Sequence, residues 1–148
     1  MKFDRGLEKF TIICAAIGLV DSVYLTWIKL THTTALCLPG IGDCETVNTS
    51  RYSEINGIPI ALLGALVYLA ILLIILLKDK ASFLGEYGLY LLFGISLVGV
   101  LYSAYLTYIE IAVIHAICPF CVISAIVILL IFVSTIVRLS QDQGSQKS

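Results

Sequence analysis

The residues best suited to chemistry are two cysteines separated by two positions, in the motif Cys118-Pro119-Phe120-Cys121. They open a long apolar segment, and proline is favoured in the first turn of a helix. A helix N-terminus stabilises the thiolate, which is the form of cysteine that attacks disulfides and other electrophiles. The motif therefore predicts a redox-active thiol pair. The alternatives are an inert structural disulfide and half of a zinc site, for which His32, His115 and the cysteines Cys37 and Cys44 would supply further ligands.

A second pair, Cys37 and Cys44, lies in a segment that also contains Pro39, Gly40 and Gly42. Such a loop is flexible enough to close a small disulfide ring. Taken alone, the pair is equally typical of a structural staple. Beside a C-x-x-C motif it favours a relay, in which a partner's thiols reduce the loop disulfide and the loop thiols reduce the second pair through mixed disulfides.

The composition indicates that most of this chain faces lipid. Of its 148 residues, 59% are hydrophobic and 13% are charged, whereas soluble domains are about 25% charged. Four apolar windows, at about 10–30, 59–77, 87–109 and 116–137, are long enough to cross a bilayer as helices. We therefore expect an all-α membrane protein, a four-transmembrane-helix bundle forming a single domain over 1–148. The net charge of −1 and the lack of a basic patch give no support to nucleic-acid binding.

The distribution of basic residues predicts the orientation, because Lys and Arg are enriched on the cytoplasmic side. Of the nine Lys and Arg residues, all but Lys29 and Arg51 lie near the termini or between the second and third windows. Both termini are thus expected to be cytoplasmic. The loop at about 31–58 and the turn before Cys118 would face outside, where disulfides form and persist.

Few other polar residues stand out. Asp21 lies in the outer half of the first window, and an intramembrane carboxylate is by default a candidate functional group. Glu110 and His115 lie at the outer interface, and we interpret them as solvated. Cys14 falls inside an apolar run and is interpreted as a small buried residue. No metal or flavin motif is visible, so a lipid-soluble quinone is the predicted electron acceptor.

Together these residues resemble the vitamin K epoxide reductase (VKOR) family, in particular its prokaryotic disulfide-forming branch. The resemblance covers nearly the whole chain: four spans, a cysteine pair in the loop after the first, and a C-x-x-C opening the fourth. The stretch from Cys44 to Tyr52 looks like the family's loop segment, with Ser50 six residues after the second loop cysteine. Gly57-Ile58-Pro59 and Gly64 resemble the family's entry into the second span.

The resemblance implies a role for each position. Cys121 matches the cysteine that faces the quinone, Cys118 the one that exchanges with the loop through Cys44, and Cys37 the one that the partner's thiol attacks first. Ser50 matches a loop serine near the quinone ring. Vertebrate epoxide-reducing members carry tyrosine four residues after the motif, where this chain has Ala125, and this departure favours quinone reduction over epoxide reduction.

We therefore predict a cell-membrane thiol:quinone oxidoreductase that uses a menaquinone- or ubiquinone-type acceptor. It would re-oxidise a thioredoxin-like, DsbA-type partner and so drive disulfide formation outside the cytoplasm. A DsbB-like oxidase is one alternative, although its C-x-x-C lies in the first outer loop. A non-catalytic membrane scaffold with static disulfides is another.

Overall fold

The structure is a computed structural model that describes residues 2–34 and 42–147. Helices dominate the described part, and a two-stranded hairpin joins the segment between the first two long ones. In chain order the elements are α1 (Lys2–Thr31), α2 (Cys44–Thr49), a 3-10 turn (Arg51–Ser53), β1 (Glu54–Ile55), β2 (Ile58–Pro59), α3 (Ile60–Leu77), α4 (Ser82–Ile109), a π-helical turn (Glu110–Ile114) and α5 (Pro119–Gln146).

Within the described residues, four helical segments are long and apolar enough to cross a membrane: Asp4–Thr31, Ile60–Leu77, Ser82–Ile114 and Pro119–Gln146. The predicted four-helix, all-α membrane fold is therefore confirmed. The last helix begins at Pro119 rather than at about 116. The chain first turns at His115, whose φ of 54° is left-handed, and proline then occupies the first helical position, where its missing N–H costs nothing.

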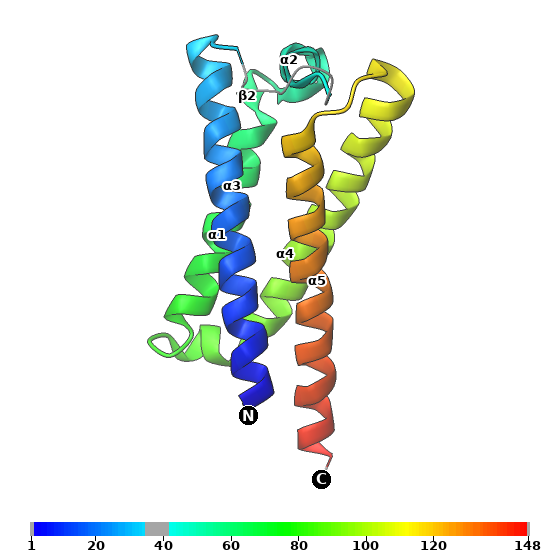
Figure 1. Cartoon of the computed structure of the whole chain (residues 1–148). Coiled ribbons are helices and arrows are strands. Elements are labelled where there is room, and N and C mark those ends of the chain that lie inside the picture. The colour runs from blue at the N-terminus through cyan, green and yellow to red at the C-terminus, as the bar shows by residue number, and fades with distance from the viewer. Residues whose placement is uncertain (1, 35–41, 148) are drawn as a thin grey trace.

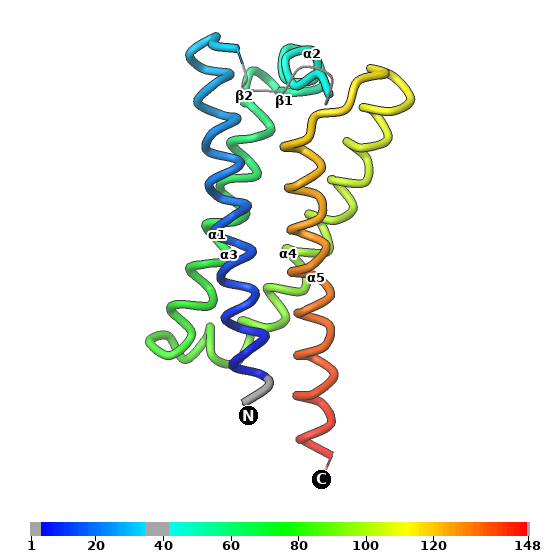
Figure 2. The backbone as a smooth tube through the Cα atoms, in the orientation of Figure 1, coloured from blue at the N-terminus to red at the C-terminus, as the bar shows by residue number. Residues whose placement is uncertain are grey.

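The long helices form one bundle. α1 packs against α3 and α5, and α4 packs against α5 and, less extensively, α3. Both termini lie at the same end of the bundle, and α2 lies at the opposite end (Figure 1). α4 runs obliquely to α1 and α5 (Figure 2).

The core of the bundle is built around the ring of Tyr68 on α3. A Cβ added to Gly18 of α1 would lie 2.4 Å from this ring, so only glycine lets the two helices approach so closely. The Tyr68 hydroxyl lies 2.9 Å from both the backbone oxygen and the Oγ of Ser124 on α5. One side chain thus joins three helices, within a buried cluster that includes Ile71 and Ile131.

Charged side chains join the helices at the end where the termini lie. Arg138 of α5 is only 9% exposed and contacts Asp4 at 2.9 Å and Glu8 at 3.3 Å, both on α1. Lys78, which follows α3, pairs with the same Glu8. Nearby, Thr11 and Ser134 share a buried hydrogen bond of 3.0 Å. Three helices are therefore tied together at this end by complementary charges.

The segment between α1 and α3 is anchored over the opposite end of the bundle. Its hairpin turns through Asn56 and Gly57, whose φ values of 51° and 82° are both positive, as a two-residue hairpin turn of this type requires. Lys29, near the end of α1, donates to the backbone oxygen of Asn48 at 2.8 Å and to the Ser53 hydroxyl. One cation thus holds this segment against the end of α1.

Candidate redox site

The C-x-x-C motif occupies the first turn of α5, as its sequence predicts. Cys118 is the residue that caps the helix and Pro119 is its first helical residue. Helix hydrogen bonding begins when the Val122 N–H donates to the Cys118 oxygen at 3.1 Å. The ring of Phe120 packs on Tyr24 of α1, with centroids 5.2 Å apart. The motif at the start of α5 thus packs against α1.

The loop that carries Cys44 approaches the motif closely. The Asp43 N–H donates to the Ile117 oxygen at 3.0 Å. Gly42 has a φ of 91°, and a Cβ there would lie 2.4 Å from that same Ile117 oxygen, so a glycine is needed for this approach. Asp43 then caps α2 by accepting from the Thr46 N–H at 3.0 Å. The hydrogen bond from the Thr46 hydroxyl, aided by this backbone bond, lowers the pKa of the Asp43 carboxyl.

This approach buries Cys44 and Cys118 in one cluster with Val47. Cys44 is fully buried and Cys118 is 1% exposed. Cys44 is disulfide-bonded, whereas Cys14, Cys118 and Cys121 are free thiols. Cys37 lies outside the described residues. The structure therefore combines an oxidised loop cysteine with a reduced C-x-x-C pair.

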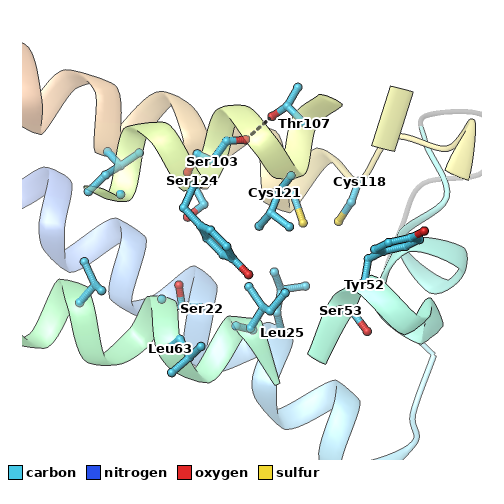
Figure 3. A pocket seen from close by; sticks show the side chains of 18 of the residues that line it. Ser22, Leu25, Tyr52, Ser53, Leu63, Ser103, Thr107, Cys118, Cys121 and Ser124 are labelled. Carbon is cyan, nitrogen blue, oxygen red and sulfur yellow. Dashed lines mark hydrogen bonds between the residues drawn. The ribbon is translucent and has the colours of Figure 1, made fainter. Parts of the chain in front are cut away.

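A cavity of about 600 Å³ lies directly beside the two free thiols. Its walls come from all four long helices and from the segment between α1 and α3. Figure 3 shows Cys118 and Cys121 on one side of this space and Leu25, Tyr52 and Ser53 across from them. The volume lies in the usual range of about 300–1,000 Å³ for small-molecule pockets. The lining is predominantly aliphatic with a few hydroxyl and carboxyl groups, which suits an apolar ligand that carries a few polar atoms.

The cavity brings together the predicted residues that lie in the described part of the chain. Cys118, Cys121, Ser50 and Asp21 line it, and Cys44 is in the adjoining cluster. The Ser50 hydroxyl donates to the Val47 oxygen at 2.7 Å. Asp21 is 7% exposed, and among the described residues its Oδ2 has no hydrogen-bond partner. A buried polar atom without a partner is costly, so Oδ2 is an available acceptor in the cavity wall.

The interpretation of Glu110 as a solvated residue is wrong. Its side chain is only 5% exposed, and its Oε2 accepts from the Cys118 N–H at 3.2 Å. The Cys121 thiol lies within hydrogen-bonding reach of the same carboxylate. The π-helical turn that starts at Glu110 directs its side chain back towards α5. The sequence alone could have indicated this, because an ionisable residue at the end of an apolar span is by default a candidate functional residue.

The two thiols of the motif are chemically different. The pKa of Cys118 lies below its ordinary value because the Cys121 thiol donates a hydrogen bond to it, aided by the N–H groups of Cys121 and Phe120. Burial and the negative charge of Glu110 act in the opposite direction. Cys118 is thus the thiol favoured to ionise and to attack a disulfide, and it is the one packed against Cys44.

Zinc ligation would need further ligands close to these thiols. Across residues 2–34 and 42–147, no three His, Cys, Asp or Glu side chains are grouped as metal ligands would be. His115 is exposed on the turn before the motif.

Comparison with known proteins supports the redox interpretation. The model of the vitamin K epoxide reductase family matches residues 9–136. The thiol-disulfide oxidoreductase LTO1 of Arabidopsis thaliana is 30% identical over 118 residues, which cover 72% of this chain. The match covers only 30% of that relative's length, so the chain corresponds to less than a third of it.

Proposed function

Because the chain belongs to the vitamin K epoxide reductase family, we propose that it is a thiol:quinone oxidoreductase of the disulfide-forming, prokaryotic type. Family membership and the likeness to a thiol-disulfide oxidoreductase support the coarser role of a disulfide oxidoreductase. The observation that carries the finer proposal is the cavity of about 600 Å³, whose wall contains the free thiols of Cys118 and Cys121.

The cavity fits a quinone chemically. A quinone has a flat ring with two carbonyl oxygens and an apolar tail, and it accepts two electrons and two protons. The aliphatic wall suits the ring and tail. We propose that the Ser50 hydroxyl donates to a quinone oxygen and that the Asp21 carboxylate accepts from a hydroxyl of the hydroquinone product. We propose that the quinone enters this cavity from the bilayer, since the helices that form its walls are long and apolar enough to cross a membrane.

We assign the electron path by the burial and ionisation of each cysteine. A thioredoxin-like, DsbA-type partner would transfer its electrons to the loop disulfide through Cys37 and Cys44. The Cys44 thiol of the reduced loop would then attack the Cys118 sulfur of the Cys118–Cys121 disulfide, since Cys44 and Cys118 lie in one buried cluster. The loop disulfide forms again and Cys121 is released as a thiol. Cys121 lines the cavity next to Cys118 and would deliver the pair of electrons to the quinone. Each exchange oxidises one dithiol and reduces one disulfide, so two electrons pass from pair to pair.

The proposed location is the cell membrane, with both termini in the cytoplasm. Lys78 and Arg138 lie at the end where the termini are, and Arg5 and Lys9 belong to the same helical end of α1. The excess of basic residues there favours the cytoplasmic side. The cysteine cluster at the opposite end would then face the oxidising compartment.

The test is quinone reduction by the purified protein in detergent, followed by absorbance, with a reduced thioredoxin-like protein as donor. We expect turnover that disappears in Cys118→Ser and in Cys121→Ser. Cys37→Ala should block oxidation of the protein donor while leaving quinone reduction by a small dithiol. Cys14→Ala is the matched control, because Cys14 is a buried thiol of α1 outside the cavity wall, and it should retain turnover.

The outcomes separate the rival functions. If no quinone is reduced despite free thiols and a competent donor, the protein is a scaffold with static disulfides. If Cys121→Ser keeps its turnover, the assigned electron path is wrong. A DsbB-like relay would require the loop cysteines, rather than the C-x-x-C, to deliver electrons to the quinone.

A further inference from the structure

Glu110 is a buried carboxylate beside the thiols that has no role in the proposed electron path. It is 5% exposed and lines the cavity together with both thiols of the motif. Its position is set by the π-helical turn Glu110–Ile114, a local departure from α-helix that is frequent at functional sites. The backbone carbonyl oxygen of Glu110 accepts from the N–H groups of His115 and of Ala116, the latter at 3.1 Å. The chain therefore folds back around Glu110 towards Cys118.

The carboxylate contacts both halves of the C-x-x-C motif. Its Oε2 accepts from the Cys118 N–H at 3.2 Å, a donor that has no partner within its own helix because it precedes the first helical turn. The Cys121 thiol is within hydrogen-bonding reach of the same carboxylate. No other carboxylate among the described residues is assigned a hydrogen bond to either thiol.

The charges of this cluster pose a problem for electron transfer. Cys118 is the thiol favoured as thiolate, and it lies beside Cys121 and Glu110. If Cys121 simply lost its proton to solvent, three neighbouring anions would be buried together, which is strongly unfavourable. If the proton instead passes to Glu110, the negative charge moves from one atom to another and the total charge of the cluster does not change.

We propose that Glu110 is a catalytic residue that accepts the proton of Cys121 during reduction of the quinone. The inference rests on the proposed function. In the step, the S–H bond of Cys121 breaks and an O–H bond forms on Glu110, while the Cys118–Cys121 disulfide bond forms. The two electrons pass to the quinone. The Glu110 proton and one proton from water complete the hydroquinone, and Glu110 returns to its carboxylate.

The test compares Glu110→Gln with Glu110→Asp. Glutamine keeps an oxygen that can accept from the Cys118 N–H but has no basic group. Single-turnover quinone reduction by the pre-reduced protein should fall at least about 100-fold in Glu110→Gln, the usual size of a lost general base. Glu110→Asp keeps a carboxylate and should recover part of this rate. Glu86→Gln makes the same change on α4, away from the thiols, and should leave the rate unaltered.

A second readout needs no quinone. Because the Glu110 charge raises the pKa of Cys118, its removal in Glu110→Gln should increase the thiolate fraction. Alkylation of Cys118 at neutral pH, followed by peptide mass spectrometry, should therefore become faster while quinone reduction becomes slower. A merely structural role would not move the two rates in opposite directions.

The outcomes are decisive for each proposal separately. If wild-type protein reduces quinone and Glu110→Gln stays within about threefold of it, well short of a lost general base, the role of Glu110 is refuted and the proposed function stands. If both rates fall together, Glu110 is structural and the inference is overturned. If wild-type protein reduces no quinone, the proposed function fails and the inference fails with it.

Discussion

The two ends of the bundle differ in what lies between the helices: ion pairs at one end and a cavity beside the cysteines at the other. At the end where the termini lie, helices are joined by complementary charges, and Arg138 is 9% exposed while contacting Asp4 and Glu8. At the cysteine end, the same helices enclose a cavity of about 600 Å³. Asp21 lines it with a carboxyl oxygen that has no hydrogen-bond partner in the described part of the chain. The Tyr68 ring, which packs on Gly18 and also lines the cavity, marks the boundary between them.

This difference indicates that one end of the bundle mainly contributes stability and the other end mainly provides the site for chemistry. A cavity gives up packing contacts, and each lost contact lowers stability. The ion pairs at the other end offset that loss and hold the ends of α1, α3 and α5 together. We therefore expect substitutions at one end to change stability with little effect on the chemistry, and substitutions at the other end to do the reverse.

The largest expected effect on stability is at Arg138. Arg138→Met removes the only cation in contact with Asp4 among the described ion pairs and leaves Glu8 with Lys78. Breaking a buried ion pair typically costs about 3–5 kcal/mol, and we expect about 3 kcal/mol because Asp4 is half exposed. Thermal unfolding in detergent measures the loss. Quinone reduction per folded molecule should be unchanged, and a selective loss of turnover would contradict the division between the ends.

An intermediate effect is expected at the boundary. Gly18→Ala places a methyl group 2.4 Å from the Tyr68 ring, and overpacking of this kind costs about 1–3 kcal/mol. Because Tyr68 also lines the cavity, the KM for quinone should rise together with the loss of stability. Gly6→Ala is the control on the same helix, since a Cβ there meets nothing within 4 Å. Equal behaviour of the two variants would show that the contact with Tyr68 is unimportant.

The smallest effect concerns the ionisation of Cys118. The hydrogen bond from the Cys121 thiol lowers the pKa of Cys118, so Cys121→Ala should raise that pKa and reduce the thiolate fraction at neutral pH. Alkylation of Cys118 should slow by about tenfold for each unit by which the pKa rises. Cys121→Ser keeps a hydroxyl donor and should slow less. Identical rates in the two variants would show that this hydrogen bond does not set the reactivity of Cys118.

The sequence was enough to predict the membrane fold and the position of the C-x-x-C motif at the start of a helix. Apolar windows of the right length must form helices in lipid, because each backbone polar group there needs a partner within its own segment. A proline directly after Cys118 places that cysteine at the start of a helix, and the structure has it there. These conclusions depend on local chain properties, which a sequence carries directly.

Only the tertiary structure decided what surrounds the thiols. Glu110 looked like a solvated interface residue, but the π-helical turn and the left-handed His115 bring it back against Cys118. The approach of Gly42 to Ile117 likewise joins segments that are 75 positions apart in the chain (117 − 42). Periodicity and composition describe each helix by itself. Contacts between segments depend on how the whole bundle packs, and a carboxylate's partners follow from that packing.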